Sequence, residues 1–325
     1  MRFFVVLVLC GACCHGGFSQ SAPIRDGTIL AFLWHDSPND LKALEGFRQG
    51  LEVLGLEQRL KVAHARRDAK AAAKILDTAA AEPIALCAAF GTESARLARA
   101  HLLHVPVVFT AVTNPVLSGI ARSWKGAGGN VAGNSNWLER RAMLKAFREA
   151  VPKMRRLAVI RTRGNAVSDA EVVEAKAAVR GMKDFEIVDV VVGETDDLRA
   201  RIGEAFGDAD ALWLPIDFQL YQEEPLKLIM ESARARRIPV VSSTLKAAGA
   251  GALIVVTVDY ALLGLKAAGL VKRILKDGAS PGRLAVGRLK SAEIYVDLGA
   301  ARLIGRKVPL DLVFRAHRIL GVEKK

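Results

Sequence analysis

Polar, charged and aromatic side chains recur in this 325-residue sequence directly after short apolar runs, where they could bind a small molecule. In the first half of the chain these residues are Trp34, His35, Asp36, Thr92, Glu93, Ser94, Thr113 and Asn114. In the second half they are Asn165, Asp217, Phe218, Ser243 and Asp259. Together they supply hydroxyl, carboxylate, amide and aromatic groups, which fix the orientation of small ligands in proteins.

Each of these side chains also has a purely structural interpretation. Thr92 or Ser94 can cap the helix that follows, although the same backbone N–H groups can hold a carboxylate or phosphate. Trp34 can stack on a planar ligand or pack in the core. Asp217 and Asp259 can face a ligand ammonium or a structural Arg or Lys. The sequence leaves both interpretations open.

Enzymatic and metal-binding patterns are missing from the sequence. His35 has no partners at metal-ligand spacing, and residues 35–38 replace the Gly-rich phosphate loop expected at a dinucleotide site. There is no nucleophile-elbow or HExxH motif. We interpret Asp36 and Asp40 as residues of a helix start rather than an acid/base pair. We therefore expect no catalytic residue, no metal and no cofactor.

The first half of the chain alternates short apolar strands with amphipathic helices. We predict strands at residues 28–35, 60–65, 83–90 and 105–112, with helices at 40–54, 69–81 and 92–103. This alternation is typical of parallel βαβ units. In open parallel sheets ligands bind beyond the carboxyl ends of the strands, which is where the polar residues above fall.

The second half repeats the same plan. We predict strands at residues 156–161, 185–192, 209–215 and 238–243, with helices at 169–182, 196–206 and 224–236. Residues 104–108 of the first half (HVPVV) correspond to residues 237–241 of the second (RIPVV). Two matched halves predict an α/β protein with two Rossmann-like lobes.

The joins between the halves predict how the lobes are connected. Residues 126–136 are rich in Gly and Asn and separate the halves, and the strands and helix expected after Ser243 are too few for a third domain. We expect them to return to both lobes, giving a multi-stranded hinge that closes around a ligand. The expected boundaries are 26–118 plus 247–283 for the first lobe and 119–246 plus 284–325 for the second.

The N-terminus reads as a targeting segment. Arg2 precedes an apolar run at residues 3–9 and a polar break at 19–21, a pattern typical of a secretory signal peptide over residues 1–22. An alternative is lipid anchoring through Cys13 or Cys14, although Cys10 stands where an aliphatic residue is expected. Cleavage would leave only Cys87, which we interpret as a small buried hydrophobe.

The composition is that of a globular protein, with 51% hydrophobic and 25% charged residues. The net charge of +13 is spread in short clusters without interleaved aromatics. We assign most of it to solvated helix faces, with steering of an anion as the alternative, and expect no nucleic-acid partner.

Several segments resemble a family of ABC-transporter substrate-binding proteins that includes tryptophan/tyrosine-type binders. Residues 107–116 (VVFTAVTNPV) followed by 128–133 (GGNVAG) resemble its signature. Residues 46–51 (GFRQGL), Asp259-Tyr260 and Gly264 resemble further segments. The resemblance implies a type I periplasmic-binding fold, in which a three-stranded hinge joins the two lobes. It also implies a periplasmic location and an ABC permease in the inner membrane as partner.

The resemblance also implies roles for particular residues. Thr92 and Ser94 match positions that hold polar groups of the ligand, Thr113-Asn114 stands where the family has Thr-Asp, and Ser168 matches a loop Ser. Asp217 and Asp259 match acidic positions.

The second lobe departs from the family pattern. Arg161-Thr162-Arg163 replaces Tyr-Asn-Pro, and Ile216 and Phe218 replace polar residues. These changes add two cations and remove polar contacts, so an anionic or larger apolar ligand is as compatible as an aromatic amino acid. We expect a monomer that binds an amino acid or small carboxylate for an importer. A sensor that presents the ligand to a membrane receptor is the alternative.

Overall fold

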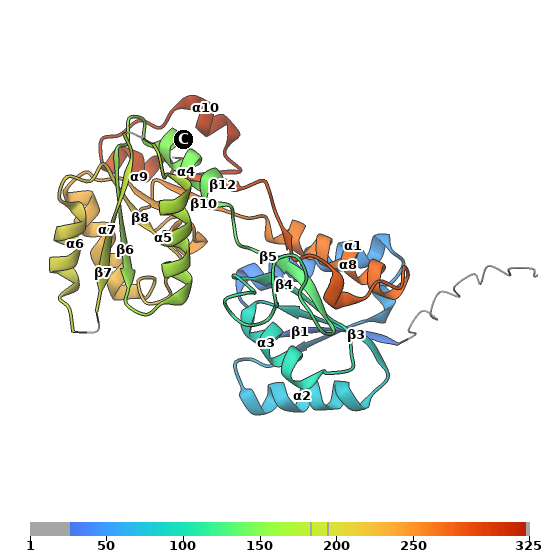
Figure 1. The fold of residues 1–325 in the computed structure, drawn as a ribbon. Helices are drawn as coiled ribbons and strands as arrows, with labels where there is room; N and C mark the ends of the chain where they lie inside the picture. The colour runs from blue at the N-terminus through green and yellow to red at the C-terminus, as the bar shows by residue number, and fades with distance from the viewer. Residues whose placement is uncertain (1–26, 183, 194, 323–325) are drawn as a thin grey trace, which may run out of the picture.

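The computed structural model describes residues 27–182, 184–193 and 195–322, and the chain forms two α/β lobes (Figure 1). The expected signal peptide and the two cysteines considered for lipid anchoring lie outside the described residues. Among the described helices, none combines the length and apolar character needed to cross a bilayer. The predicted fold class, two lobes with mainly parallel sheets, is confirmed.

Lobe 1 is built on a six-stranded parallel sheet with the order β11-β5-β4-β3-β1-β2. Its strands are β1 (Thr28–Leu33), β2 (Leu60–His64), β3 (Ile84–Phe90), β4 (Val107–Val112), β5 (Val131–Ser135) and β11 (Gly287–Arg288). Its helices are α1 (Pro38–Val53), α2 (Ala69–Ala81), α3 (Thr92–His101) and α8 (Tyr260–Leu275).

The alternation of side chains along β1 shows why both faces of this sheet are covered. Ile29 and Leu33 belong to a core cluster shared with α1 and α8. Leu30 and Phe32, on the opposite face, pack with α2 and α3. Successive residues of a strand point to opposite faces, so an all-apolar strand requires helices on both sides.

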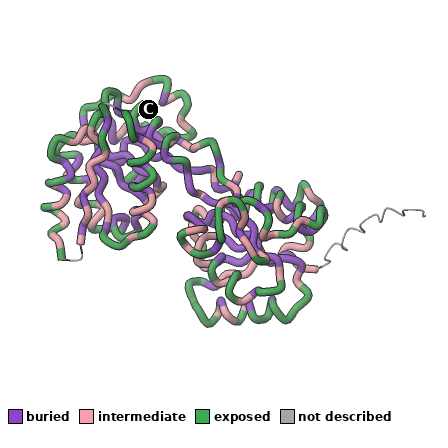
Figure 2. The backbone as a smooth tube through the Cα atoms, in the orientation of Figure 1, coloured by how far each residue is buried: buried purple, intermediate pink, exposed green. Residues whose placement is uncertain are grey.

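Lobe 2 has a seven-stranded sheet with the order β13-β12-β10-β9-β8-β6-β7, in which only the β10–β12 pair is antiparallel. Its strands are β6 (Arg156–Thr162), β7 (Glu186–Val192), β8 (Ala211–Leu214), β9 (Val240–Ser242), β10 (Ile254–Thr257), β12 (Glu293–Asp297) and β13 (Arg318–Leu320). Its helices are α4 (Arg140–Ala150), α5 (Ala166–Ala178), α6 (Leu198–Phe206), α7 (Glu223–Ala235), α9 (Leu298–Leu303) and α10 (Leu310–Arg315). Figure 2 shows the buried backbone running through the middle of each lobe.

Three segments cross between the lobes, as the sequence predicts, but they lie elsewhere along the chain. They follow β5, β10 and β11. β5 belongs to the sheet of lobe 1, and β10 to that of lobe 2, so the expected boundaries at 118/119 and 246/247 need correction. The third boundary moves from 283/284 to beyond Arg288, because β11 pairs with β5. The Gly- and Asn-rich residues 126–136 are expected to join the halves, yet residues 131–135 within them form the buried strand β5.

Helices α1 and α8 pack against each other at backbone contact distance. A Cβ atom on Gly46 would lie 1.9 Å from the carbonyl oxygen of Ala261. A Cβ atom on Gly264 would lie 1.8 Å from that of Ala43. Glycine is therefore required at both positions, and the packing fixes α8 beside the start of α1 at the edge of the site.

Candidate functional site

A cavity of about 720 Å³ lies between the lobes and draws its walls from both. This volume falls within the roughly 300–1,000 Å³ typical of small-molecule sites. From lobe 1 and the hinge the lining residues are His35, Asp36, Ser37, Pro38, Asn39, Asp40, Arg67, Gly91, Thr92, Glu93, Ala111, Thr113, Asn136, Leu138 and Tyr260. From lobe 2 they are Arg140, Val167, Glu171, Ile216, Phe218, Ser243, Thr244, Lys246, Val256 and Thr257.

On the lobe 1 side, the N-termini of α1 and α3 open into the cavity. Ser37 caps α1, because its hydroxyl accepts a hydrogen bond from the Asp40 N–H at 3.0 Å. The hydroxyl of Thr92, the first residue of α3, accepts a hydrogen bond from the Thr113 N–H at 3.2 Å and so ties α3 to the end of β4. Two helix N-termini present partial positive charge to the cavity, which favours an anionic group there.

Asp40 is buried where α1 meets the cavity. Its side chain accepts a hydrogen bond from the Ser37 hydroxyl at 2.7 Å and lies 3.8 Å from Nδ1 of His35. Burial raises the pKa of the Asp40 carboxyl, and the Ser37 hydrogen bond and the His35 charge oppose that rise. The predicted helix-start role of Asp40 is confirmed by this geometry. Asp36 instead pairs with His64.

On the lobe 2 side, Arg140 and Glu171 form a buried ion pair. Glu171 also accepts hydrogen bonds from the Ile216 N–H at 2.5 Å and the Ser243 hydroxyl at 3.3 Å. Burial raises the pKa of Glu171, and Arg140 opposes this most strongly. The Arg140 guanidinium lies 4.5 Å from the centre of the Trp137 ring. Glu171 of α5 thus connects Arg140 at the start of α4 with the residues that follow β8 and β9.

The hinge forms the floor of the cavity. Asn136, in the first crossing segment, donates a hydrogen bond to the Tyr260 hydroxyl at 3.0 Å, just after the second crossing. Burial raises the pKa of Tyr260, so it remains a neutral phenol at physiological pH. Within the described part of the chain, the buried atom Asn136 Oδ1 has no hydrogen-bond partner, whereas Arg140 Nε lies 3.9 Å from the Glu174 carboxylate. The hinge floor therefore contains one unpaired acceptor.

Phe218 and Lys246 give lobe 2 an exposed edge at the cavity. Phe218 is 66% exposed, and the Lys246 ammonium lies 4.8 Å from its ring centre. An aromatic ring at a cavity edge supplies contact area that a closing lobe or a ligand can bury.

Seven of the residues predicted from the sequence line this cavity: His35, Asp36, Thr92, Glu93, Thr113, Phe218 and Ser243. In lobe 1 the others lie behind its wall. The Trp34 N–H donates to the buried Ser94 hydroxyl at 2.7 Å, and the Trp34 ring packs on the core. Asn114 is buried, and its side chain accepts a hydrogen bond from the Leu117 N–H. These residues support the loops in this conformation, and direct ligand contact by them stays a prediction.

Two of the predicted lobe 2 residues, Arg161 and Asp217, bind other side chains of lobe 2. Arg161 forms ion pairs with Asp189 and Asp169 and is not among the lining residues. Asp217 is fully buried and accepts hydrogen bonds from the backbone and hydroxyl of Thr162 and from Ser168.

Two further predicted residues of the second half serve as helix caps. Asn165 caps α5, and Asp259 caps α8. The expected gain of two cations at the cavity therefore does not arise through Arg161, because two carboxylates neutralise it.

Four further residues line the cavity that were not predicted from the sequence: Asn136, Arg140, Glu171 and Tyr260. The sequence contained one signal for Glu171. It lies next to Val172 and one turn before Ala175, and both of these apolar residues are buried in α5. A carboxylate on the apolar side of a helix needs a buried partner. Among the described residues, no group of three or more His, Cys, Asp or Glu side chains could hold a metal ion.

The sequence matches the model of the family described as ABC transporter substrate binding protein over residues 28–319. The chain belongs to this family. The resemblance noted from residues 107–133 is thereby confirmed, and the family is one of binding proteins rather than enzymes.

Individual relatives agree with this assignment. The chain is 27% identical over 266 residues to the tyrosine-binding protein of Clostridioides difficile (strain R20291), covering 81% of this chain and 76% of that protein. A ligand-free, open substrate-binding protein with adhesive properties from Clostridium difficile has a TM-score of 0.81 at 22% identity, covering 92% and 100% of the two chains. An ABC domain in complex with L-Trp from Streptococcus pneumonia has a TM-score of 0.69 at 19% identity, covering 90% and 100%. The solved structures show that the fold is shared.

Proposed function

We propose that this protein is the solute-binding component of an ABC importer, exported to the periplasm, where it binds an amino acid or a small carboxylate between its lobes. The observation that carries the proposal is the cavity, which is lined from both lobes and floored by the hinge. A ligand that contacts both walls favours the closed arrangement, because only then are all its contacts made. The loaded protein would then deliver the ligand to an inner-membrane permease.

The groups around the cavity support a zwitterionic or anionic ligand. The N-termini of α1 and α3 suit a carboxylate. The free acceptor Asn136 Oδ1 suits an ammonium group. Ile216 and Phe218 provide apolar surface for a side chain. The naming of one relative as a tyrosine-binding protein and the L-Trp complex of another are consistent with this chemistry.

Export is supported by the apolar N-terminal run and by the family. The expected signal peptide would place the mature chain in the periplasm, and lipid anchoring through Cys13 or Cys14 is the alternative that N-terminal sequencing or mass spectrometry of the secreted protein would distinguish.

A thermal-shift screen tests the proposal. L-tyrosine, L-tryptophan and a set of small carboxylates are added to the purified protein, and a true ligand at a hundred times its Kd should stabilise the folded state by about 2.7 kcal/mol. Absence of stabilisation by every compound, with no ligand detected by native mass spectrometry, would contradict the proposal.

A cleft variant with a matched control locates the binding. Phe218→Ala should weaken the binding found in the screen by about tenfold, the equivalent of one buried apolar contact. It should leave the ligand-free melting temperature nearly unchanged, because Phe218 is exposed. Phe314→Ala removes an 82% exposed ring of lobe 2 that does not line the cavity and should leave affinity unchanged. Equal effects of the two variants would argue against this cavity as the binding site.

A further inference from the structure

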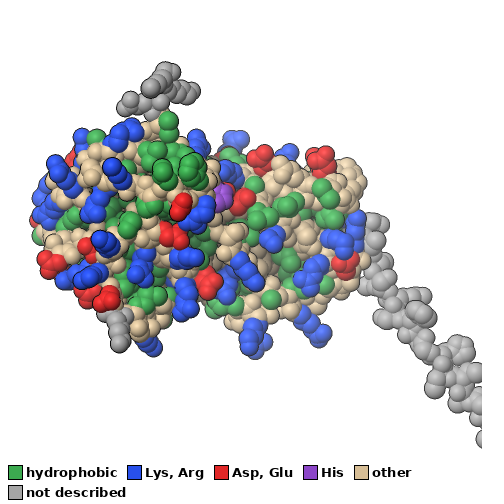
Figure 3. Space-filling model, turned by 90° about the horizontal axis from the view of Figure 1, so that it is seen from above, with side chains coloured by type: hydrophobic (Ala, Val, Ile, Leu, Met, Phe, Trp, Pro, Cys, Tyr) green, Lys and Arg blue, Asp and Glu red, His purple; other side chains and the backbone are tan. Residues whose placement is uncertain are grey.

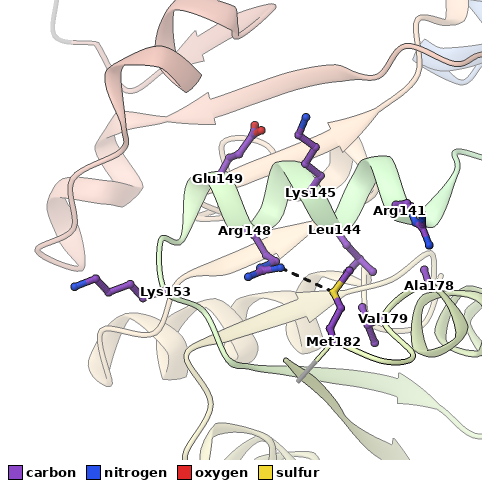
Figure 4. Close-up of a pocket in the computed structure, with 9 residues that line it drawn as sticks. All are labelled: Arg141, Leu144, Lys145, Arg148, Glu149, Lys153, Ala178, Val179 and Met182. Carbon is purple, nitrogen blue, oxygen red and sulfur yellow. Dashed lines mark hydrogen bonds between the residues drawn. The ribbon is translucent and has the colours of Figure 1, made fainter. Parts of the chain in front are cut away.

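A second surface of lobe 2 combines apolar and basic side chains and takes no part in the interlobe cavity. Helices α4 and α5 border a groove of about 450 Å³ whose floor includes Leu144, Val179 and Met182. Lysines and arginines stand along α4 at its rim, and Figure 4 shows Lys145 and Lys153 extending away from the apolar floor. Both lysines are exposed.

Helix α10 continues this surface. Its residues Leu310 and Phe314 are 69% and 82% exposed, and their spacing of four places them on one side of the helix. The Arg315 guanidinium lies 2.7 Å from the Glu149 carboxylate, which holds α10 beside the C-terminal end of α4. In Figure 3, hydrophobic side chains gather on one part of lobe 2, with Lys and Arg around them.

Three lysines of this surface are not neutralised. Within the described part of the chain, Lys145, Lys153 and Lys307 have no ion-pair partner, and all three are exposed. The exposed Asp311 of α10 is the acidic residue between Lys307 and Phe314. We define the α4–α10 face by Lys145, Lys153, Lys307, Leu310 and Phe314.

We propose that the α4–α10 face binds the surface of a membrane that contains anionic phospholipids. Protruding Leu and Phe side chains can enter the boundary between headgroups and acyl chains, while neighbouring lysines contact lipid phosphates. Contacts between proteins are depleted in lysine, so unpaired lysines around exposed apolar residues favour a lipid partner over a protein partner. This inference goes beyond the proposed function and uses none of the cavity residues.

The position of the face makes such binding compatible with ligand exchange. Helix α4 begins with Arg140 in the wall of the cavity, and its 11 residues carry the chain away from it by roughly 16 Å. Lobe 2 could thus rest on a membrane while lobe 1 opens and closes.

Vesicle co-sedimentation tests the proposal with protein that is secreted and then purified, so that every variant carries the same N-terminus. One set of vesicles contains phosphatidylcholine alone, and the other contains phosphatidylcholine with phosphatidylglycerol. The protein should bind the second set, and added salt should release it. Leu310→Ser with Phe314→Ser, or Lys145→Glu with Lys153→Glu, should each lower partitioning by about tenfold or more.

Matched controls come from lobe 1. Leu103→Ser with Val53→Ser replaces residues that are 66% and 84% exposed, and Lys70→Glu with Lys74→Glu reverses two exposed charges of α2. Both controls should bind within about twofold of the parent protein, because screened charges far from the contact contribute little.

Three results would overturn the proposal. Equal binding to both vesicle types would show that anionic lipid is not required. Losses in the lobe 1 controls as large as those in the face variants would remove the role of this face. Self-association of the vesicle-free protein that Leu310→Ser with Phe314→Ser abolishes, measured by sedimentation velocity, would assign the face to a second copy of the chain.

Discussion

Arg140 and Glu171 form an ion pair that is buried in lobe 2 and reaches the wall of the interlobe cavity. Arg140 is 3% exposed and Glu171 is fully buried. The pair connects the first helix after the hinge with the ends of β8 and β9, because Glu171 also accepts hydrogen bonds from Ile216 and Ser243. The Glu171 carboxylate thereby contacts three segments of the wall: the start of α4, the residues after β8 and the residues after β9.

Removing one member of this pair should destabilise the protein strongly. Glu171→Gln removes the buried carboxylate that pairs with Arg140 and leaves only the partly exposed Glu174 carboxylate, 3.9 Å from Arg140 Nε. We expect a loss of about 3 kcal/mol in the free energy of unfolding. Urea denaturation followed by circular dichroism measures it. Arg140→Met combined with Glu171→Leu should recover much of that loss, since no charge is then left unpaired.

An exposed pair provides the control for that measurement. Glu93→Gln breaks the pair with Arg96, whose side chains are 38% and 57% exposed. Its cost should stay below about 1 kcal/mol. A loss in Glu171→Gln as small as in Glu93→Gln would show that the buried pair does not organise the wall.

Asp40 should make stability depend on pH in a definite direction. Burial raises the pKa of Asp40 in the folded state. The contribution of its protonation to folding stability is therefore fully present below the unfolded pKa of about 3.9, and it is lost as pH rises through the folded pKa. Asp40→Asn lacks this titration. We therefore expect stability of the parent protein, relative to Asp40→Asn, to fall as pH rises above about 4. Parallel stability curves from urea denaturation at a series of pH values would contradict the assignment.

The close packing of α1 on α8 should tolerate no side chain at Gly264. A Cβ there would meet the Ala43 backbone, and backbone cannot move aside as a side chain can. Gly264→Ala should cost at least about 2 kcal/mol through overpacking. Gly269→Ala in the same helix has no atom within 4 Å of the new Cβ and should be neutral or stabilising by up to about 1 kcal/mol. Similar melting temperatures for the two variants would refute the packing argument.

Cys87 should be chemically silent in the folded protein. It is fully buried in β3, and burial raises the pKa of its thiol to about 12, so almost no thiolate exists at neutral pH. Iodoacetamide labelling followed by mass spectrometry of the Cys87 peptide should show modification only in denaturant. Rapid labelling of native protein would mean that this strand opens readily.

The sequence predicts most of the fold because βαβ units are defined by local patterns. The two matched halves follow from alternating apolar runs, and α2 begins and ends where the pattern indicates. Strand β5 was not predicted, because Gly133 and Asn134 interrupt its run of apolar residues. Gly133 is required by close contact with the Phe109 backbone, and the Asn134 amide donates to the distant Leu263 carbonyl at 2.9 Å. Both contacts are with residues distant in the sequence, so the sequence around β5 does not indicate them.

The site was only partly predictable for a similar reason. The rule that ligands bind beyond strand ends finds loops that line the cavity, including those of Thr92, Thr113 and Ser243. It does not say which side chain of a loop faces the cavity. Arg161 turns to Asp189, 28 residues along the chain, and only the register of β6 beside β7 brings the two together.

Small-angle X-ray scattering of the protein with and without its best stabilising ligand tests the central claim most directly. If the ligand binds between the lobes and closes them on the hinge, the radius of gyration at saturation should be smaller than that of the free protein. A ligand that binds tightly while the radius of gyration stays unchanged would contradict the account.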